Sequence, residues 1–577
     1  MTYSDEQLKN YPWLKLYPEQ VNWSAHIPEA PLYRLLDDAT DLYPERNVID
    51  FLGKKYTYRE LHTLVLKAAK GLQELGVKKG TKVGIFMPNA PAFIIFYYAI
   101  LKAGGTVVNF SPLYSARELS QQIKDADAEI MVMLDLEALY EKIRNLFDET
   151  PLQKIIVCPL SEQLPFPKNI LFPIFKSKEI AKIKWDMKHL RFKDLIQNDG
   201  VIRPVDINPR EDVAIFQYTG GTTGLPKGAM LTHANVYANA YQANMWFVRE
   251  EGSQEKILAG LPLFHVFAMT AVMNVAIVMG GEIVMMFPRF NVDDAMKMVQ
   301  EHKITFFPAV PTIYTMICNH PNVRNFKLSS LKICLSGGAP LPVEIKKQFE
   351  DLTGCKLIEA YGLSETSPAA TSNPLYGVNK PGSIGIPFPG TIIKVCSVED
   401  PTKEVPHGEK GEICIAGPQV MKGYWKRPAE TSSTLIDGFL HTGDVGYIDE
   451  DGYIFLVDRI KDVILCNGYN VYPRNVEEAI YLHPAVEETT VIGVPDKRRG
   501  ENVKAFIKLK EGFSLTDVEL VEFLQDKLAS YQMPQMIEFR DSLPKTMIGK
   551  LSKKELVAEE LEKLKNQAAA DVKNQVG

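Results

Sequence analysis

The sequence lacks any short segment in which cysteines or histidines stand at the spacing of a metal site. Its seven cysteines are scattered and none forms a C-x-x-C pair, so neither a disulfide framework nor a zinc site is indicated. No H-E-x-x-H pair is present, and we assign no metal site to histidine. Scattered cysteines without a disulfide framework are typical of proteins in a reducing compartment, so we predict a cytoplasmic protein.

The sequence also lacks a strong charge bias and a signal for export. Its net charge is -6 and its pI is near 6.0, which argues against nucleic acid as a main partner. Residues 1–20 contain no apolar stretch of the kind that forms a signal peptide. A length of 577 residues exceeds what one core usually organises, so we expect at least two domains.

One long run without Asp, Glu, Lys or Arg imitates a membrane span. It covers residues 257–281 and is long enough to cross a bilayer. It contains Pro262, His265 and Asn274, and it lies between two motifs that we expect at one site. A crossing would separate those motifs, so we predict a buried helix and an active-site loop instead.

Short β-branched or aromatic runs followed by amphipathic stretches recur from residue 49 to about residue 458. Strand followed by helix, repeated, predicts an α/β fold with mostly parallel sheets flanked by helices. After a charged run at residues 458–462, a shorter αβ segment begins and ends in a polar helical tail. We therefore expect a large N-terminal domain, residues 1–458, and a small C-terminal domain, residues 459–577. The clearest strand and helix pairs are residues 82–87 with 90–101, 213–218 with 232–246, and 331–335 with 342–352.

A loop rich in glycine and threonine follows the expected strand at residues 213–218. It reads Thr219-Gly220-Gly221-Thr222-Thr223-Gly224-Leu225-Pro226-Lys227-Gly228. Its N–H groups, hydroxyls and one ammonium can wrap a polyphosphate. It is not a Walker A loop, because no G-x-x-x-x-G-K-[ST] occurs in the chain. The absence of G-x-S-x-G likewise leaves hydrolase chemistry without support.

This order of residues resembles the superfamily of adenylate-forming enzymes, which includes acyl-CoA synthetases and peptide-synthetase adenylation domains. The resemblance covers nearly the whole chain, because further motifs follow in the family's order. It implies ATP, Mg²⁺ and coenzyme A as cofactor and co-substrates, and a C-terminal domain that moves. It also implies that the phosphates are held by Thr219, Gly220, Gly221, Thr222, Thr223, Gly224 and Lys227, of which Lys227 also contributes catalytic charge.

Three later motifs imply the rest of the nucleotide site. Tyr361-Gly362-Leu363-Ser364-Glu365-Thr366 is similar to the motif whose tyrosine stacks on adenine and whose glutamate ligates Mg²⁺. Thr442-Gly443-Asp444 matches the ribose motif, in which Arg459 assists Asp444. Ser336-Gly337-Gly338-Ala339-Pro340 is similar to the adenine-side loop. The resemblance thus assigns the nucleotide to Gly338, Ala339, Ala360, Tyr361, Gly362, Ser364, Asp444 and Arg459, and Mg²⁺ to Glu365 and Thr222.

The C-terminal segment carries the remaining assignments that the resemblance implies. Lys550 stands in a motif similar to the one that carries the family's catalytic lysine. The small domain would swing about the residue matching Lys461. That movement would bring Gly468-Tyr469-Asn470 to the channel for the pantetheine arm of coenzyme A.

The substrate class follows from a closer resemblance. Residues 437–446 and 452–459 look like the signature stretches of bacterial and archaeal fatty-acyl-CoA synthetases, which implies a long-chain fatty acid–CoA ligase. His265 matches the catalytic residue beside the substrate carboxylate, and Gly338 would border the acyl group. Met269 and Met273 follow His265 at helical spacing and offer flexible apolar walls, although a methionine stripe equally suits plain core packing.

Two departures from the family pattern and several alternatives stay open. Met269 stands where some long-chain relatives carry a gating tryptophan, and Gly220 stands where serine is commoner. An aryl- or medium-chain acyl-CoA synthetase fits the same motifs. A third alternative belongs to a different class of protein, a lipid-binding or membrane scaffold without catalytic activity. The intact motifs argue against it.

A basic and aromatic segment lies at residues 166–193. It combines Lys168, Lys176, Lys178, Lys182, Lys184, Lys188 and Arg191 with Phe172, Phe175 and Trp185, against only Glu179 and Asp186. Such a segment can hold a protein peripherally to the anionic inner face of a membrane. A solvated insertion fits the composition equally well.

Overall fold

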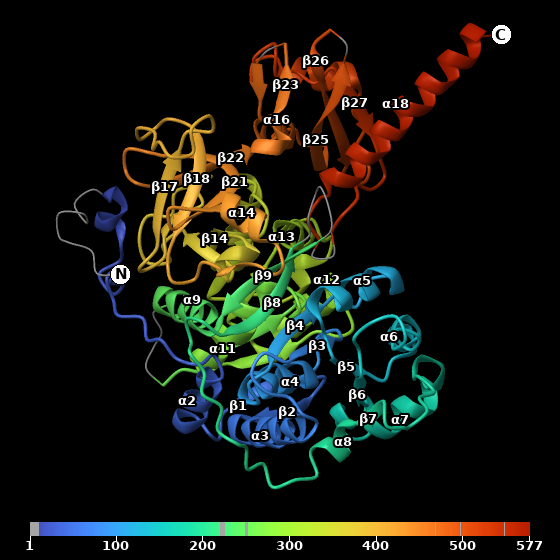
Figure 1. Cartoon of the computed structure of the whole chain (residues 1–577). Helices are drawn as coiled ribbons and strands as arrows, with labels where there is room; N and C mark the ends of the chain where they lie inside the picture. The colour runs from blue at the N-terminus through green and yellow to red at the C-terminus, as the bar shows by residue number, and fades with distance from the viewer. Residues whose placement is uncertain are drawn as a thin grey trace.

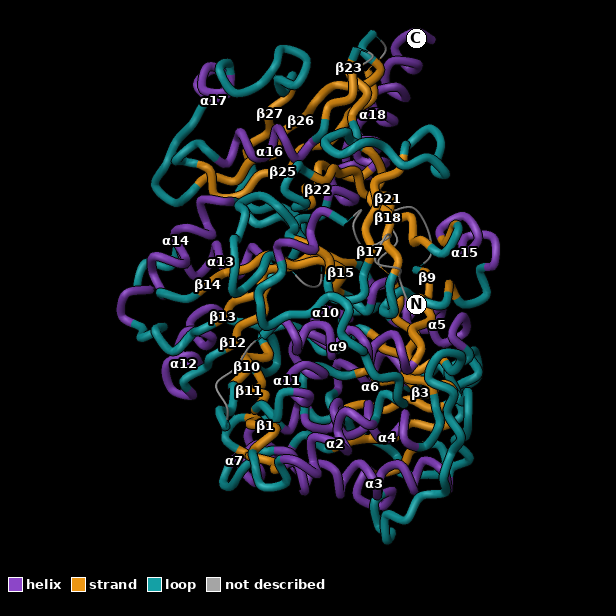
Figure 2. The backbone as a smooth tube through the Cα atoms, turned by 90° about the vertical axis from the view of Figure 1, so that its left-hand side faces the viewer, coloured by secondary structure: helices purple, strands orange, loops and turns teal. Residues whose placement is uncertain are grey.

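The computed structural model contains two large sheets, a smaller antiparallel sheet and a C-terminal αβ part (Figure 1). It describes residues 11–219, 226–247, 252–467, 469–496, 498–546 and 549–576, with side chains as far as residue 566. Figure 2 shows helices packed around the large sheets in the lower part and the C-terminal part above them.

The first large sheet has eight strands in the order β19-β9-β8-β4-β3-β5-β6-β7. The strands from β8 to β7 run parallel, whereas β8 and β9 form an antiparallel hairpin. The bounds are β3 (Lys82–Phe86), β4 (Thr106–Phe110), β5 (Ile130–Leu134), β6 (Lys154–Cys158), β7 (His189–Arg191), β8 (Val213–Thr219), β9 (Lys227–Thr232) and β19 (Gly423–Tyr424).

The second large sheet has nine strands in the order β16-β15-β14-β13-β12-β10-β11-β1-β2. Its strands from β14 to β1 run parallel, and antiparallel strands flank them at both edges. The bounds are β1 (Asn47–Phe51), β2 (Lys54–Thr57), β10 (Lys256–Ala259), β11 (Glu282–Met285), β12 (Phe306–Ala309), β13 (Ile333–Gly337), β14 (Lys356–Gly362), β15 (Ala369–Ser372) and β16 (Ile386–Pro387).

Helices connect these strands and bury their apolar faces against them. In α4 every residue is buried, as its apolar sequence predicts, and Pro91 stands at its start, where no N–H is needed. In α9 the Thr232 side chain caps the helix by accepting from the N–H of Asn235. The bounds are α2 (Arg34–Leu42), α3 (Tyr58–Glu74), α4 (Pro91–Lys102), α5 (Ala116–Ala126), α6 (Glu137–Ile143), α7 (Lys168–Phe175), α8 (Phe192–Leu195), α9 (His233–Trp246), α10 (Val266–Ala268), α11 (Val275–Val278), α12 (Val292–His302), α13 (Pro311–Cys318), α14 (Val343–Thr353) and α15 (Pro428–Thr434).

The third sheet is antiparallel and was not expected from the strand and helix pattern. It is built from β17 (Ile392–Cys396), β18 (Gly411–Ala416), β20 (Leu435–Ile436), β21 (Phe439–Ile448) and β22 (Ile454–Arg459). Most of its strands follow one another through short connections without a long helix, so a search for βα repeats does not reveal it.

The C-terminal part has its own sheet and its own buried clusters. Its strands are β23 (Ile464–Cys466), β24 (Tyr469–Val471), β25 (Val486–Asp496), β26 (Gly500–Leu509) and β27 (Met536–Phe539). Its helices are α16 (Pro473–Tyr481), α17 (Asp517–Leu524) and α18 (Lys553–Val576). The 3₁₀ turn η7 (Ile460–Asp462) joins β22 to β23 and so connects this part to the rest.

The predicted fold class is confirmed. Mostly parallel sheets with helices form the large N-terminal part, and each predicted strand and helix pair appears within two residues of its expected bounds. Residues 257–281 form β10, α10, the π-helix η4 (Met269–Asn274) and α11, and they are almost wholly buried. No helix in the described ranges is long and apolar enough to span a bilayer.

Candidate active site

Lys550 reaches the N-terminal part of the chain from the loop between β27 and α18. A Cβ atom at Gly338 would stand 2.8 Å from the Cε of Lys550 and 3.3 Å from its Nζ. Gly338 also has a φ of +87°, which favours glycine, and a side chain at this position would displace the end of the Lys550 side chain. Thr312 fixes the loop, because its Oγ1 donates a hydrogen bond of 2.9 Å to the carbonyl of Gly549. Lys550 and the adenine-side loop, remote in sequence, therefore meet.

Burial controls the charges around Lys550. Burial is the largest of the effects that lower the pKa of Lys550 to about 8. The positive charge of Arg459 lowers this pKa further, and the negative charge of Asp444 raises it. Burial, and secondly the Lys550 ammonium, lower the pKa of His265 to about 3, so the imidazole is neutral. His265 Nδ1 accepts from the N–H of Phe267 at 3.2 Å, which leaves the ring proton on Nε2. A cation and a neutral hydrogen-bond donor thus lie together in a half-buried site suited to an anion.

Asp444 lies beside this cluster on β21. Its Oδ2 accepts a hydrogen bond of 2.7 Å from the Tyr361 hydroxyl, and Arg459 Nε lies 2.9 Å from its Oδ1. The carboxylate is 3% exposed, and burial raises its pKa. Oδ1 has no aligned hydrogen-bond donor in the described part of the chain. Because a carboxylate only accepts, this oxygen suits the hydroxyls of a sugar.

Glu365 and Lys227 meet through a residue that the motifs did not single out. The Tyr424 hydroxyl donates a hydrogen bond of 2.7 Å to Glu365 Oε1. The Lys227 ammonium lies 5.1 Å from the centre of the same ring, within the range of a cation–π contact. Tyr424 therefore holds the predicted metal ligand and the predicted phosphate lysine on one side of the site.

The ends of the strands place the other residues that the sequence predicts for the nucleotide. Thr219 pairs with Lys227 where β8 and β9 diverge into the loop, and Gly220, Gly221, Thr222, Thr223 and Gly224 lie outside the described residues. Ala360 pairs with Gly337 across β14 and β13, next to Gly338 and the half-buried Ala339. A Cβ at Gly362 would stand 1.8 Å from the carbonyl O of Pro368, so glycine is required two residues before Ser364. All these residues gather at the carboxyl ends of parallel strands, where such folds bind ligands.

The comparisons with known proteins agree with this geometry. Residues 36–425 match the family described as AMP-binding enzyme, and residues 475–550 match the AMP-binding enzyme C-terminal domain. The chain belongs to the AMP-binding enzyme family.

Relatives of this AMP-binding enzyme are similar over nearly their whole length. The chain is 44% identical to a long-chain-fatty-acid–CoA ligase of Bacillus subtilis, over 96% of this chain and 98% of that protein. It is 36% identical to a protein of the same name from Escherichia coli, over 96% and 99%. Among solved structures, ATP-bound MatB from Rhodopseudomonas palustris matches with a TM-score of 0.81 and 29% identity, over 92% and 99%.

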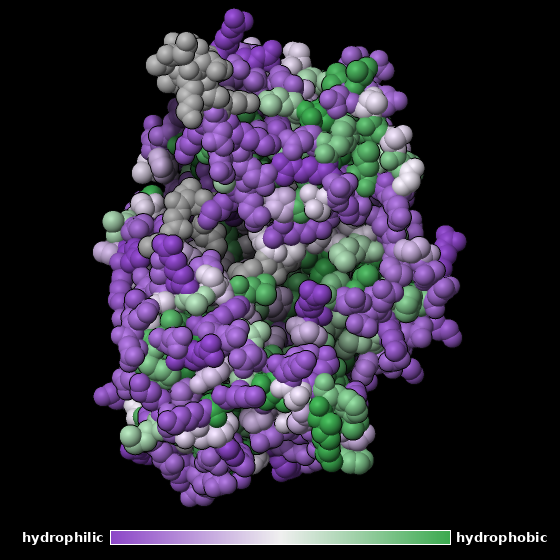
Figure 3. Space-filling model, turned by 90° about the vertical axis from the view of Figure 1, so that its right-hand side faces the viewer, coloured by the Kyte–Doolittle hydropathy of each residue, from purple (hydrophilic) through white to green (hydrophobic). Residues whose placement is uncertain are grey.

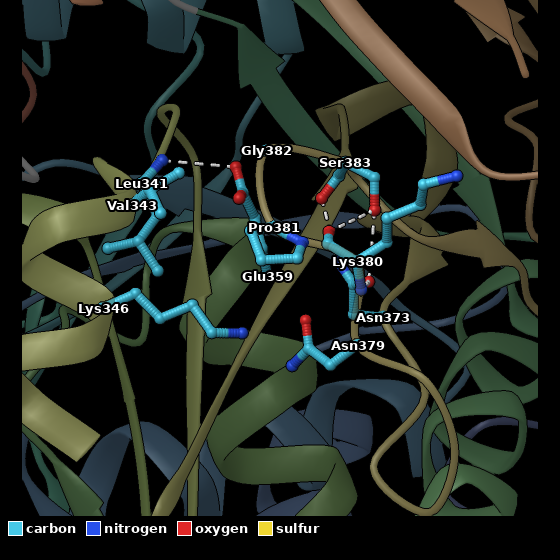
Figure 4. Close-up of a pocket in the computed structure, with 10 residues that line it drawn as sticks. All are labelled: Leu341, Val343, Lys346, Glu359, Asn373, Asn379, Lys380, Pro381, Gly382 and Ser383. Carbon is cyan, nitrogen blue, oxygen red and sulfur yellow. Dashed lines mark hydrogen bonds between the residues drawn. The ribbon is translucent and has the colours of Figure 1, made fainter. Parts of the chain in front are cut away.

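A small polar pocket of this AMP-binding enzyme lies beside β14 (Figure 4). One of the residues that line it is Glu359, two positions before Tyr361. Glu359 accepts a hydrogen bond of 3.2 Å from the N–H of Leu341, and Lys346 and Asn379 point toward one another across the pocket. Burial raises the pKa of Glu359 to about 7, against the pull of Arg474 on α16. The carboxyl can therefore be neutral or charged near pH 7, and it faces both parts of the chain.

Some predicted residues lie away from the Lys550 cluster. Tyr469 is 57% exposed, and its ring stacks on Tyr531 of the same C-terminal part at 4.7 Å. Asn470 is likewise exposed, Gly468 lies outside the described residues, and Lys461 lies exposed in η7. In this arrangement the C-terminal part places Lys550 in the site, whereas β24, which carries Tyr469, lies away from it.

Met269 and Met273 are fully buried in the π-helix that follows His265. Met269 Sδ lies 3.6 Å from Nδ2 of Asn109, whose amide also donates a hydrogen bond of 3.0 Å to Gln217. A π-helix widens one turn of backbone and often marks a functional segment. This π-helix begins one turn after His265.

Sequence reasoning missed Thr312, Tyr424 and Glu412. Thr312 and Gly549 are in contact although far apart in sequence, and no local pattern predicts such a contact. Glu412 accepts a hydrogen bond of 2.8 Å from the N–H of Gly443, next to Asp444. Tyr424 could have been noticed as an aromatic residue after a glycine in a short strand, but that signal is weak.

Proposed function

We propose that this AMP-binding enzyme is a long-chain-fatty-acid–CoA ligase, which converts ATP, a fatty acid and coenzyme A into acyl-CoA, AMP and diphosphate through an acyl-adenylate. The observation that carries the proposal is the contact of Lys550 with Gly338, beside Asp444 and His265. The relatives named long-chain-fatty-acid–CoA ligase support the substrate class.

In the first step the fatty acid carboxylate attacks the α-phosphate, and diphosphate leaves. Both partners are anions, so the barrier is mostly electrostatic. Lys550 places a half-buried positive charge where negative charge develops, and Lys227 adds another at the phosphate loop. His265, neutral with its proton on Nε2, donates to the carboxylate and orients it. Asp444 accepts from the ribose hydroxyls and positions the nucleotide.

Glu365 is the described residue that would hold Mg²⁺. The ion prefers oxygen ligands and commonly takes one carboxylate together with phosphate oxygens. Glu365 fits, because Tyr424 occupies Oε1 and no described residue makes a hydrogen bond or ion pair with Oε2. Thr222, which the resemblance adds as a second ligand, lies outside the described residues. When bound, the ion neutralises charge on the phosphates.

We take residues 459–577 as the mobile domain. β22 ends at Arg459 in the antiparallel sheet, and β23 begins another sheet after the η7 turn. The coenzyme A thiol must attack the same carboxyl carbon that Lys550 faces during adenylation. A rotation about Lys461 would withdraw Lys550 and bring Tyr469 and Asn470 toward the site.

The proposed function is tested by ATP–diphosphate exchange and thioester formation across acids of increasing chain length. We expect the highest kcat/KM for long-chain acids. A maximum for benzoate or for medium-chain acids would favour the aryl- or medium-chain alternative. If no acid supported ATP–diphosphate exchange, the protein would not be a ligase, and the non-catalytic lipid-binding scaffold would be the interpretation that remains.

The pKa of Lys550 predicts an alkaline limit to adenylation. Lysine is charged below its pKa, so kcat/KM for ATP should fall about tenfold per pH unit above about pH 8, the value in the free enzyme. His265, with a pKa of about 3, should add no acid limb between pH 5 and pH 7. Lys550→Arg keeps the charge to higher pH, so the limb should disappear although the rate is lower. An unchanged limb in Lys550→Arg would assign it to another group.

Met269→Trp tests whether the π-helix lines the acyl site. Extra volume in a packed site costs ~1–3 kcal/mol, so we expect roughly a tenfold loss of kcat/KM for long-chain acids and little change for short ones. Met269→Leu conserves the volume and is the matched control. If Met269→Trp keeps the wild-type chain-length profile in the exchange assay, Met269 belongs to the core.

We also propose that residues 166–193 attach the protein peripherally to anionic membranes. None of the residues of α7 is buried, and Phe166, Ile174 and Phe175 are 78%, 64% and 76% exposed. Figure 3 shows a hydrophobic patch low on this side of the molecule, at the height of α7 in Figure 1. Within the described residues, Lys178, Lys182 and Lys184 make no ion pair or hydrogen bond, so their charges stay available to lipid.

Vesicle sedimentation measures this attachment. A lysine near an anionic surface contributes ~1 kcal/mol, so the double variant Lys182→Gln, Lys184→Gln should bind anionic vesicles about 30-fold more weakly. The control carries the same neutralisation at Lys327 and Lys403, which are exposed elsewhere. Equal binding to neutral and anionic vesicles, or binding that resists high salt, would contradict the proposal.

A further inference from the structure

The loop that carries Lys550 rests on the start of α13, which lies on the side of the N-terminal part that faces the C-terminal part (Figures 1 and 2). Thr312, in the first turn of α13, donates a hydrogen bond of 2.9 Å from Oγ1 to the carbonyl oxygen of Gly549. We propose that Thr312 is a positioning residue that holds Lys550 in the site during adenylation, and that this hydrogen bond breaks when the acyl group passes to coenzyme A. This role rests on the proposed function, in which the two half-reactions need different arrangements of the C-terminal part.

The carbonyl oxygen that Thr312 binds belongs to the peptide group that joins Gly549 to Lys550. A peptide group is planar, so fixing its oxygen also fixes the direction in which the chain enters Lys550. The neighbouring backbone groups bind one another, because the N–H of Thr546 donates to the carbonyl of Lys550 at 2.7 Å and the N–H of Gly549 donates to that of Thr546 at 2.9 Å. Those bonds stay within the C-terminal part, whereas the bond to Thr312 crosses to the N-terminal part.

Val310 and Thr312 lie between the two glycines that flank Lys550 in space. A Cβ at Gly338 would stand 3.7 Å from Val310 Cγ1. A Cβ at Gly549 would stand 3.7 Å from Val310 Cγ2 and 3.3 Å from Thr312 Oγ1. Gly549 also has a φ of +83°, a conformation that favours glycine. The backbone on both sides thus approaches the start of α13 closely, so a change at Thr312 is transmitted to Lys550.

The Thr312 hydroxyl is not needed to form α13 itself. The helix has Pro311 in its first turn, where a missing N–H costs nothing, and no side chain caps it. Thr315, one turn later, shows what a helical threonine commonly does, since its Oγ1 donates to the carbonyl of Pro311 at 3.1 Å within the same helix. The hydroxyl of Thr312 instead leaves its own helix and binds the other part of the chain.

The strength of this bond suits a contact that is made and broken in each catalytic cycle. A neutral hydrogen bond adds little net stability, equivalent to a factor of about two to ten in an equilibrium constant. A rotation about Lys461 would carry Gly549 away from Thr312, and water can then pair with the hydroxyl because Thr312 is half-buried. Separating a buried ion pair at the same place would be far less favourable. Thr312 therefore favours the adenylation arrangement without preventing rotation.

Single-turnover kinetics of the full-length protein tests this role, with ATP and a long-chain acid in one arm and synthetic acyl-adenylate with coenzyme A in the other. Thr312→Val has nearly the same shape but lacks the hydroxyl, so adenylation should slow by roughly five- to tenfold while transfer stays within about twofold of wild type. Thr312→Ser keeps the hydroxyl and should adenylate at close to the wild-type rate. Thr315→Val is the matched control, because the bond that it loses stays inside α13.

The pH profile separates positioning from a general loss of stability. Burial, and secondly the charge of Arg459, lower the pKa of Lys550 to about 8, whereas Asp444 raises it. A Lys550 that is held in the site less often takes a pKa closer to its ordinary value. The alkaline limb of adenylation in Thr312→Val should therefore move to higher pH, by up to about one unit for a tenfold weaker hold. His265, whose pKa is about 3, does not titrate in this range.

Three outcomes would overturn the proposal. The first is adenylation at the wild-type rate in Thr312→Val, or a slower reaction whose alkaline limb stays at the wild-type pH. The second is an equal loss in Thr315→Val or in Thr312→Ser, and the third is an equal loss of both half-reactions. A wild type that forms no acyl-adenylate with any acid would contradict the proposed function as well, whereas a wild type that adenylates beside an unaffected Thr312→Val contradicts the role of Thr312 alone.

Gly549→Ala covers the case in which Thr312→Val does not fold. Its methyl group would stand 3.3 Å from Thr312 Oγ1 on a backbone that favours glycine, so it should push the two groups apart from the opposite side. We expect the same pattern, with slower adenylation and transfer from the supplied acyl-adenylate retained. Unchanged adenylation in Gly549→Ala would show that the contact does not position Lys550.

Discussion

Replacing Lys550 with alanine slows acyl-adenylate formation by about 10²- to 10³-fold, the usual loss for one preorganised donor. Lys550 lies against Gly338 and is half-buried near Asp444 and Arg459. Adenylation joins two anions there, whereas the attack of the coenzyme A thiol on the finished anhydride needs no cation at this place. Thioester formation from a supplied acyl-adenylate is therefore expected to survive in Lys550→Ala.

Single-turnover kinetics separates the two half-reactions. One arm contains ATP and fatty acid, and the other contains synthetic acyl-adenylate and coenzyme A. Lys545→Ala is the matched control, because Lys545 stands in the same motif but forms an ion pair of 2.5 Å with Glu488 in the C-terminal part. It should leave adenylation within a few-fold of wild type. If Lys550→Ala lost both half-reactions equally, the lysine would have a structural role.

The large sheets could be predicted because their signals are local. Apolar runs such as residues 82–86 read as buried parallel strands, and the amphipathic stretches after them read as helices. The antiparallel sheet around β18 lacks that alternation with helices, and it was missed. The π-helix was missed too, because its residues have the composition of an ordinary buried helix.

The candidate site could be predicted only as far as motifs mark it. Lys227, Glu365, Asp444 and Lys550 stand in recognisable segments, and the fold brings each to the carboxyl ends of the strands. The residues that hold them in place carry no such mark. Thr312, for example, was missed because its contact with Gly549 depends on how the C-terminal part is placed against the rest.

Contacts made across strands show the same limit. Cys396, Cys414 and His441 look scattered in the sequence, and only strand register makes them neighbours. A one-residue shift in either pairing would turn one of these side chains to the opposite face of the sheet. Sequence spacing reveals side chains that meet within one loop and misses those that meet across strands.

The N-terminal and C-terminal parts are arranged so that the turn between them should control transfer of the acyl group to coenzyme A. Lys550 and Tyr469 belong to one C-terminal part, yet Lys550 lies in the site while Tyr469 stacks on Tyr531 away from it. The connection between the parts is the η7 turn with the exposed Lys461. A single rotation at η7 would move Lys550 out of the site and bring Tyr469 toward it.

Lys461→Pro should therefore slow transfer to coenzyme A by about 10²-fold while adenylation changes little. Proline fixes φ near -65°, which suits the 3₁₀ turn seen here, so the arrangement that places Lys550 in the site is kept. The rotated arrangement needs another φ at residue 461, and a thiol held even slightly out of place loses about that factor. Lys461→Ala removes the side chain without fixing φ, and it should transfer the acyl group at close to the wild-type rate. The same two-arm single-turnover experiment decides it: a Lys461→Pro enzyme that loses adenylation first, or transfers normally, would place the hinge elsewhere.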